Sequence, residues 1–132
     1  MTTFLLDANV LIALTAKEHM HHRRASAWAA GVSSFAICPV VEGALVRFVV
    51  RMGGAAADAQ RTLRLVGRRP GYVFWPDSVS YADAGLGHIR GHRQVTDAYL
   101  ASLASAQPDA RLATLDEALA AALPEAVTLI PA

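Results

Sequence analysis

Four acidic residues stand where a small α/β protein places side chains for chemistry. Three of them come soon after short apolar runs that predict buried strands, and the fourth lies in the first turn of an expected helix. In chain order the acids are Asp7, Glu42, Asp97 and Asp116. The carboxyl ends of the strands in an open α/β sheet form the crevice where ligands bind. In a parallel sheet at least three of these acids therefore meet at one edge, and Asp97 joins them if its helix starts near that edge.

Such a group of carboxylates needs a counter-charge. Two carboxylates ~4 Å apart repel by about 4 kcal/mol at an effective dielectric constant near 20. Mg²⁺ and Mn²⁺ prefer oxygen ligands and bind through one or two carboxylates, water and the phosphate of a substrate. Such a site activates water and stabilises an in-line displacement at phosphorus. The pattern therefore predicts metal-dependent hydrolysis of phosphodiester bonds.

Each acid taken singly also fits a purely structural role. Asp is a favoured helix N-cap, and acids in a first turn complement the helix dipole. Asp7 and Asp116 fit such a role, whereas Glu42 interrupts an apolar stretch and Asp97 has Thr96 beside it as the expected cap. The joint pattern favours a site.

Alternating strands and helices must position these residues. Strands are expected at 4–6, 35–38, 72–75, 111–115 and 127–130, with the strand at 72–75 at a sheet edge. Helices are expected at 9–16, 39–50, 55–66, 96–104 and 118–123, and a further helix carries 28–31. Residues 80–89 are expected to form a loop. This alternation predicts an α/β fold over residues 1–132: a single three-layer domain with a mainly parallel central sheet and helices on both faces.

Composition narrows the setting of the protein. Hydrophobic residues make up 54% of 132, yet charged residues interrupt every apolar run before the ~18 residues that a membrane span needs. The N-terminus lacks the features of a signal peptide, and the single cysteine, Cys38, cannot form an internal disulfide. We therefore expect a cytoplasmic protein without membrane contact, whose excess apolar surface meets a partner chain.

The basic residues are biased toward arginine, since only Lys17 of 12 is a lysine. Arginine suits phosphate recognition, but a coding bias explains the same composition equally well. Arg47, Arg90 and Arg93 are the candidates for contact with a nucleic acid backbone, because each lies near an acid in the sequence. Phosphate contacts of this kind give affinity rather than sequence choice. Tyr99 and Trp75 are expected in the core rather than stacked on bases.

Four sequence blocks around the acids resemble the motifs of PIN-domain ribonucleases, in the order that the family has them. They are most similar to the blocks of VapC-type toxins from bacterial toxin–antitoxin pairs, and the similarity covers residues 4 to about 123. The blocks are Leu5–Ile12, Val41–Arg47, Val95–Ala101 and Leu112–Asp116. The resemblance implies a PIN-like fold and a Mg²⁺- or Mn²⁺-dependent endoribonuclease acting on RNA. It also implies a homodimer that a cognate VapB-type antitoxin holds inactive.

The resemblance assigns roles residue by residue. Asp7 and Asp97 bind the metal most directly, and Glu42 and Asp116 act directly or through water. Thr114 matches a small hydroxyl residue that orients Asp116 or a water, and Asn9 matches a supporting polar position. The chain departs from the family before Glu42, where Pro39 and Val40 replace a frequent hydroxyl residue. This departure affects only the expected helix cap.

Two other functions remain open from the sequence. A receiver-like or flavodoxin-like binding module has an acidic pocket too, but a receiver requires a late lysine, and Lys17 is early. A catalytically inactive PIN-like scaffold keeps the fold without cleaving RNA. The apolar faces at 46–50 and 11–14 are candidate docking surfaces, although burial in the core explains them as well.

Overall fold

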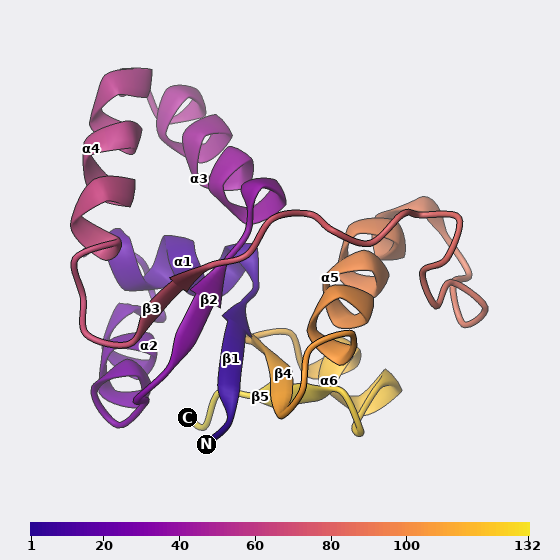
Figure 1. Cartoon of the computed structure of the whole chain (residues 1–132). Helices are drawn as coiled ribbons and strands as arrows, with labels where there is room; N and C mark the ends of the chain where they lie inside the picture. Colours follow the sequence, from indigo (N-terminus) through magenta and orange to yellow (C-terminus); the bar gives the residue numbers. More distant parts are fainter.

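One sheet of five parallel strands forms the centre of the computed structural model, which describes residues 1–132 (Figure 1). Across the sheet the strands are β3 (Tyr72–Phe74), β2 (Phe35–Ile37), β1 (Thr3–Leu6), β4 (Ala110–Thr114) and β5 (Val127–Leu129). Parallel pairing throughout and the edge position of β3 confirm the sequence prediction. The order 3-2-1-4-5 differs from the 2-1-3-4-5 order of flavodoxin-like and receiver folds, so the receiver-like alternative is wrong.

Helices cover both faces of this sheet. They are α1 (Ala8–Thr15), α2 (His22–Ala30), α3 (Pro39–Arg51), α4 (Ala56–Val66), α5 (Val95–Ser105) and α6 (Glu117–Ala122). The crossovers from β1 to β2 and β3 run in one direction along the sheet, and those from β3 to β4 and β5 run in the other. Because such crossovers are right-handed, α1–α4 lie on one face and α5 and α6 on the other. The expected three-layer α/β architecture is confirmed.

The central strands form the middle of the core because they are covered on both sides. Leu5 of β1, Ala36 of β2 and Leu112 of β4 are completely buried. Continuous apolar strands of this kind are typical of parallel sheets. Trp75 and Tyr99 are also buried, as predicted. This packing fixes the carboxyl edge of the sheet, where the acids lie.

The start of β3 depends on a glycine. Gly71 has φ +85°, and a Cβ there would lie 2.1 Å from the carbonyl oxygen of Ser33. Only glycine adopts this backbone conformation so close to another chain segment. The Gly71 carbonyl then accepts a 3.0 Å hydrogen bond from the amide of Phe35, which sets β3 beside β2. The edge strand and the residues after it are positioned by this turn.

The expected cap of α5 is wrong. Thr96 lies inside the first turn of α5, because a short 3₁₀ helix, η1 (His92–Gln94), runs directly into it. The Gln94 side chain instead accepts hydrogen bonds from the amides of Arg90 (2.6 Å) and Gly91 (3.2 Å). The Gln94 side chain therefore caps the N-terminus of η1. Helix α5 has no side-chain cap of its own. No helix in the structure combines the length and apolar character required to cross a membrane.

Candidate active site

Asp7 lies at the carboxyl end of β1 and is held on both of its side-chain oxygens. It is only 5% exposed, and its amide continues the β1–β4 ladder by donating to the carbonyl of Ala113 (2.9 Å). Oδ1 accepts from the amide of Ala8 (2.7 Å), which makes Asp7 the N-cap of α1. Oδ2 accepts from the hydroxyl of Thr114 (2.7 Å). The carboxylate is therefore fixed in orientation before any ligand binds.

Thr114 is the centre of a small hydrogen-bond network. It is completely buried at the end of β4. Its hydroxyl accepts from the amide of Asp116 (3.1 Å) and from the side-chain amide of Asn9 (3.4 Å). The Asn9 carbonyl oxygen accepts in turn from the amide of Leu115 (3.3 Å). Thr114 thus touches the backbone of Asp116 but the side chain of Asp7, so the side chain that it orients is Asp7.

Asp116 combines a capping role with a place beside the other acids. Its Oδ1 accepts from the amide of Leu119 (3.1 Å), so it is the N-cap of α6. Asp116 also raises the pKa of both Asp7 and Asp97, which shows that its charge lies close to theirs. Asp116 is therefore a helix cap whose charge also acts on Asp7 and Asp97, and its part in catalysis stays a prediction.

Asp97, in the first turn of α5, completes a group of three acids. Desolvation and then repulsion by Asp7 and Asp116 raise its pKa to about 6. Burial likewise raises the pKa of Asp7, although its hydrogen bonds to Thr114 and Ala8 oppose the shift. Asp97 and Asp116 line a cleft of about 190 Å³ between α5 and α6. The structure thus brings three of the four predicted acids to one place.

Glu42 is in the first turn of α3, as predicted, but the acid whose charge acts on it is one that sequence analysis missed. Partial burial raises the pKa of Glu42, and Asp77 adds to the shift. Asp77 follows strand β3 at the carboxyl edge, which is the same pattern that identified Asp7 and Asp116. Its position after Pro76 made it look like part of a turn. Cys38, the N-cap of α3, makes no side-chain capping bond, in agreement with the missing hydroxyl residue.

The three candidate arginines differ in their relation to the acids. Arg93 lines the cleft that contains Asp97 and Asp116. Arg47 bends back along α3, so that its Nη1 lies 3.7 Å from the point where a Gly43 side chain would begin. Arg90 is exposed. None forms an ion pair, since the ion pairs of the structure are Met1–Asp109 and Arg61–Asp58.

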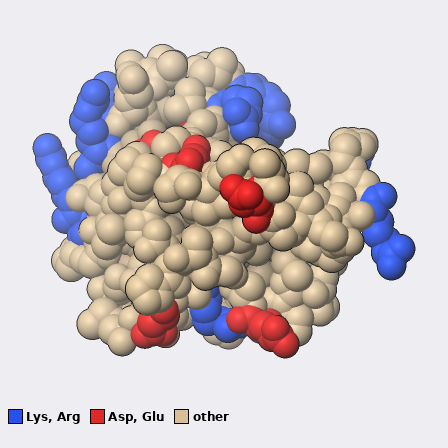
Figure 2. Space-filling view, turned by 45° about the vertical axis from the view of Figure 1, so that its right-hand side comes forward, with Lys and Arg blue, Asp and Glu red and all other residues tan.

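Acidic and basic side chains occupy separate patches of the surface. Figure 2 shows acidic side chains in the middle of the upper half of one face, with basic side chains to either side of them. The acids of the site lack a basic partner in the protein, because no ion pair includes any of them. The negative charge of the group is therefore not compensated by an ion pair, and Arg93 lines the same cleft as Asp97 and Asp116.

The donor set fits a hard divalent cation that keeps part of its water. All of the side chains that repel one another here are carboxylates, and oxygen ligands are what Mg²⁺ and Mn²⁺ prefer. The side chains do not form a ready-made group of three or more close ligands. A cation held by one or two carboxylates and water is compatible with this spacing. Asp7 and Asp97 are the side chains whose desolvated charge such a cation would relieve.

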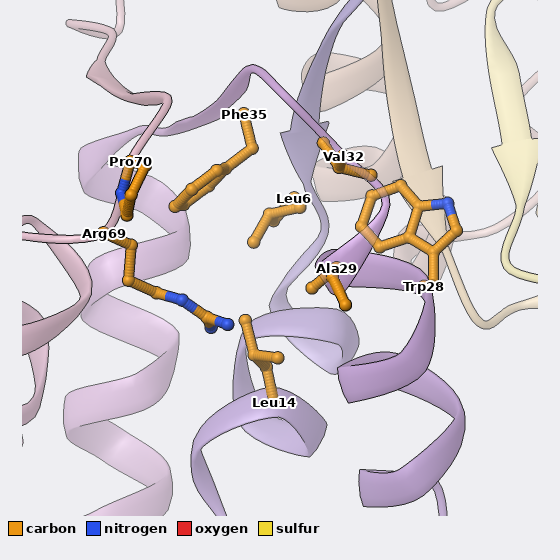
Figure 3. Close-up of a pocket in the computed structure, with 9 residues that line it drawn as sticks. Leu6, Leu14, Trp28, Ala29, Val32, Phe35, Arg69 and Pro70 are labelled. Carbon is orange, nitrogen blue, oxygen red and sulfur yellow. The ribbon is translucent and has the colours of Figure 1, made fainter.

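An apolar pocket of about 220 Å³ lies apart from the acids. Figure 3 shows Leu14 of α1, Trp28 of α2 and Phe35 of β2 around it, with the Arg69 side chain reaching toward Leu14. None of the four predicted acids lines this pocket. The pocket therefore belongs to the face opposite the α5–α6 cleft and not to the carboxylates.

The two candidate docking surfaces differ in exposure. Leu11 and Leu14 are buried, whereas Val50 is 51% exposed.

Comparison with known proteins adds evidence from outside the chain. It is 49% identical over 130 residues to "Ribonuclease VapC29" of Mycobacterium tuberculosis, with 98% of this chain and 97% of the relative covered. "Ribonuclease VapC39" of the same organism is 38% identical over 128 residues, covering 89% and 91%.

A solved structure and a family model agree with these relatives. A chain of the crystal structure of VapBC2 from Rickettsia felis, bound to a promoter DNA fragment, has the same fold: the TM-score is 0.67 at 18% identity, covering 98% of this chain and 100% of that one. The PIN-domain model matches residues 4–122. On this match and on the relatives' identity, the chain belongs to the PIN-domain family.

Proposed function

We propose that this protein is a VapC-type toxin, an endoribonuclease that hydrolyses phosphodiester bonds of RNA and that a cognate VapB-type antitoxin neutralises. The observation that carries the proposal is the gathering of Asp7, Asp97 and Asp116, without a basic partner, at the carboxyl edge of the sheet. The 49% identity to a protein named Ribonuclease VapC29 supports RNA as the substrate. The four acids are the proposed catalytic residues.

Mg²⁺, with Mn²⁺ as a substitute, is the proposed cofactor. Asp7 and Asp97 hold it most directly, while Glu42 and Asp116 act directly or through water. When bound, the cation supplies activation of water and stabilisation of the charge that develops at phosphorus. Thr114 fixes the orientation of the Asp7 carboxylate, and Asn9 supports Thr114. The protein's own contribution is an Asp7 carboxylate that two hydrogen bonds fix in orientation, beside the partly buried Asp97.

Arginines around the acids hold the RNA backbone in this proposal. Arg93 is the nearest of the three candidates to the carboxylates, because it shares their cleft. Arg90 and Arg47 are exposed and are the further candidates for contact with the backbone. A guanidinium group donates two parallel hydrogen bonds to phosphate, so these contacts position the substrate without selecting a base.

The proposal includes a homodimer of single PIN domains, each spanning residues 1–132, in the cytoplasm, where cellular RNA is translated. Exposed apolar side chains on α3, after it and on α4 support a partner subunit: Val50, Met52 and Leu65 are 51–70% exposed. Large apolar side chains left exposed in this way are the sequence's candidates for a protein contact.

Cleavage of RNA by the purified chain tests the proposal. The wild type is expected to cut single-stranded RNA with Mg²⁺ or Mn²⁺ and to stop when EDTA is added. Asp7→Asn or Asp97→Asn removes a charged ligand, so the rate should fall by about 100-fold or more. Asp58→Asn on α4 is the matched control and should cleave normally.

Two outcomes would contradict the proposal in different ways. Folded Asp7→Asn and Asp97→Asn variants that cut as well as the wild type would disprove the catalytic assignment. Failure of the wild type to bind Mg²⁺ or Mn²⁺ in calorimetry would favour a catalytically inactive scaffold. Sequencing of RNA 5′ ends after induced expression would then identify the RNA that is cut, or show that none is.

A further inference from the structure

A second cleft adjoins the one that holds the carboxylates. It has a volume of about 570 Å³ and lies between α5 and the segment that precedes η1. His88 lines both clefts, and the neighbours Asp97 and Ala98 of α5 line one each. At the end of α6, Ala122 lines the first cleft and the next residue, Leu123, lines the second. Because three separate segments border both clefts, the two lie side by side.

Hydrogen bonds preform the second cleft. The Ser102 hydroxyl accepts from the amide of Gly85 (2.8 Å), which fixes the loop against α5. The Tyr99 hydroxyl donates to the carbonyl of Val79 (2.8 Å), which fixes the start of the loop, and the Tyr99 ring stacks on Tyr81 at 4.4 Å. The walls are therefore held in place by α5 rather than by a ligand.

The chemistry of the walls suits a base better than a phosphate. No arginine or lysine lines the second cleft, whereas Arg93 lines the first. The second cleft offers the apolar side chains of Val79 and Leu123, the imidazole of His88 and the polar groups of Ser105 and Asp83. Single-stranded RNA is recognised by this combination, in which a base stacks on a ring and forms hydrogen bonds along its edge.

We propose that this second cleft binds the base of the nucleotide next to the scissile phosphate, with His88 packing against the base and Asp83 and Ser105 forming hydrogen bonds to its edge. The inference rests on the proposed ribonuclease function and adds to it a site of base selection. The Asp83 carboxylate accepts hydrogen bonds but donates none. Uracil offers it only N3–H, between two carbonyl oxygens that a carboxylate repels, so Asp83 favours a base with an amino group.

Two variants change the cleft and leave all four acids in place. His88→Ala removes the ring, and Ser105→Trp fills the cleft from an exposed position on α5. Loss of one stacked base corresponds to about a 10-fold rise in KM for short single-stranded RNA of randomised sequence. Sequencing of the product ends should show that the base preference at one position beside the cut is lost. Asp83→Asn should weaken the discrimination against uracil at that position.

Matched controls lie outside both clefts. His92→Ala changes an exposed histidine of η1, and Ala57→Trp adds the same bulky ring to an exposed site on α4. Both should keep the KM and base preference of the wild type. Circular dichroism must show that each variant is folded. Cross-linking of wild-type protein to RNA that carries 6-thioguanosine, which keeps an amino group, gives a second measurement without any substitution, with cross-links expected in peptides containing residues 79–88 or 102–106.

The results separate this inference from the function on which it rests. Unchanged KM and base preference in His88→Ala and Ser105→Trp, while Asp97→Asn is inactive, would overturn the base site and leave the nuclease intact. If the wild type cuts no RNA, fluorescence anisotropy measures how tightly the wild type and the two cleft variants bind the same oligonucleotides, and this affinity tests the base site. Binding that falls in both cleft variants would support the site, and binding that is absent or unchanged would overturn it.

Discussion

The hydroxyl of Thr114 donates a 2.7 Å hydrogen bond to Oδ2 of Asp7, across 107 residues of sequence and between two adjacent strands. This bond ties the acid at the end of β1 to the end of β4, from which Asp116 follows two residues later. The position of one carboxylate is thereby coupled to the backbone of the segment that carries another.

Loss of this hydroxyl should affect both activity and stability. Thr114→Val removes the donor to Asp7 and leaves the amide of Asp116 without its acceptor, a change that costs about 1–3 kcal/mol of unfolding free energy. The bond lowers the pKa of Asp7, so its loss should shift the acidic limb of the pH–rate profile to higher pH. Thr114→Ser keeps the hydroxyl, so its unfolding free energy and its pH–rate profile should stay close to those of the wild type. An unshifted pH–rate profile in Thr114→Val would show that Thr114 does not tune Asp7.

The raised pKa of Asp97 predicts how stability depends on pH without a divalent cation. Its pKa rises from 3.8 to about 6, so at pH between these values the folded protein keeps a proton that the unfolded chain releases. Stability should therefore fall as the pH rises through this range, and remain lower above it. Because Asp97 is only partly buried, the contribution is on the order of 1–2 kcal/mol.

Asp97→Asn provides the test of this pH dependence. The variant should be more stable than the wild type above pH about 6, and the difference should vanish below pH about 4. Urea denaturation in buffers with EDTA measures it. Parallel stability curves for the two proteins across this range would contradict the assigned charge repulsion.

A cation that binds the carboxylates should stabilise the folded protein. At a concentration 100-fold above its Kd, Mg²⁺ is expected to add about 2.7 kcal/mol to the unfolding free energy, because it binds only the folded site. The gain should be largely lost in Asp97→Asn and kept in Asp58→Asn, which lies on α4. Differential scanning fluorimetry against Mg²⁺ concentration measures it. Equal gains in both variants would place the ion elsewhere.

Arg93 should contribute to RNA affinity through charge alone. Arg93→Ala is expected to raise KM for all sequences alike and to reduce the slope of log KM against log salt by about 0.7, the value for one contact to single-stranded nucleic acid. Arg61→Ala, which removes an arginine already paired with Asp58, is the control. A change in base preference rather than in the salt slope would assign Arg93 a different role.

The sequence by itself determined the alternation of strands and helices and the four motif blocks. Its local patterns were sufficient because apolar runs, Pro39 at the start of α3 and an acid after a strand act over a few residues. The same rule applied to Asp77 after β3 would have found that acid as well. The start of α5 was missed, because η1 and the Gln94 cap depend on a turn that no local periodicity reveals.

Only the tertiary structure decided which acids act on one another. The order of the strands places β1 beside β4, so Asp7, Asp97 and Asp116 share one electrostatic environment while Glu42 lies nearer to Asp77. It also decided that Thr114 orients Asp7 and that His88 joins two clefts. Charge repulsion and hydrogen bonding depend on distance in space, and spacing along the chain does not specify that distance for residues on different strands.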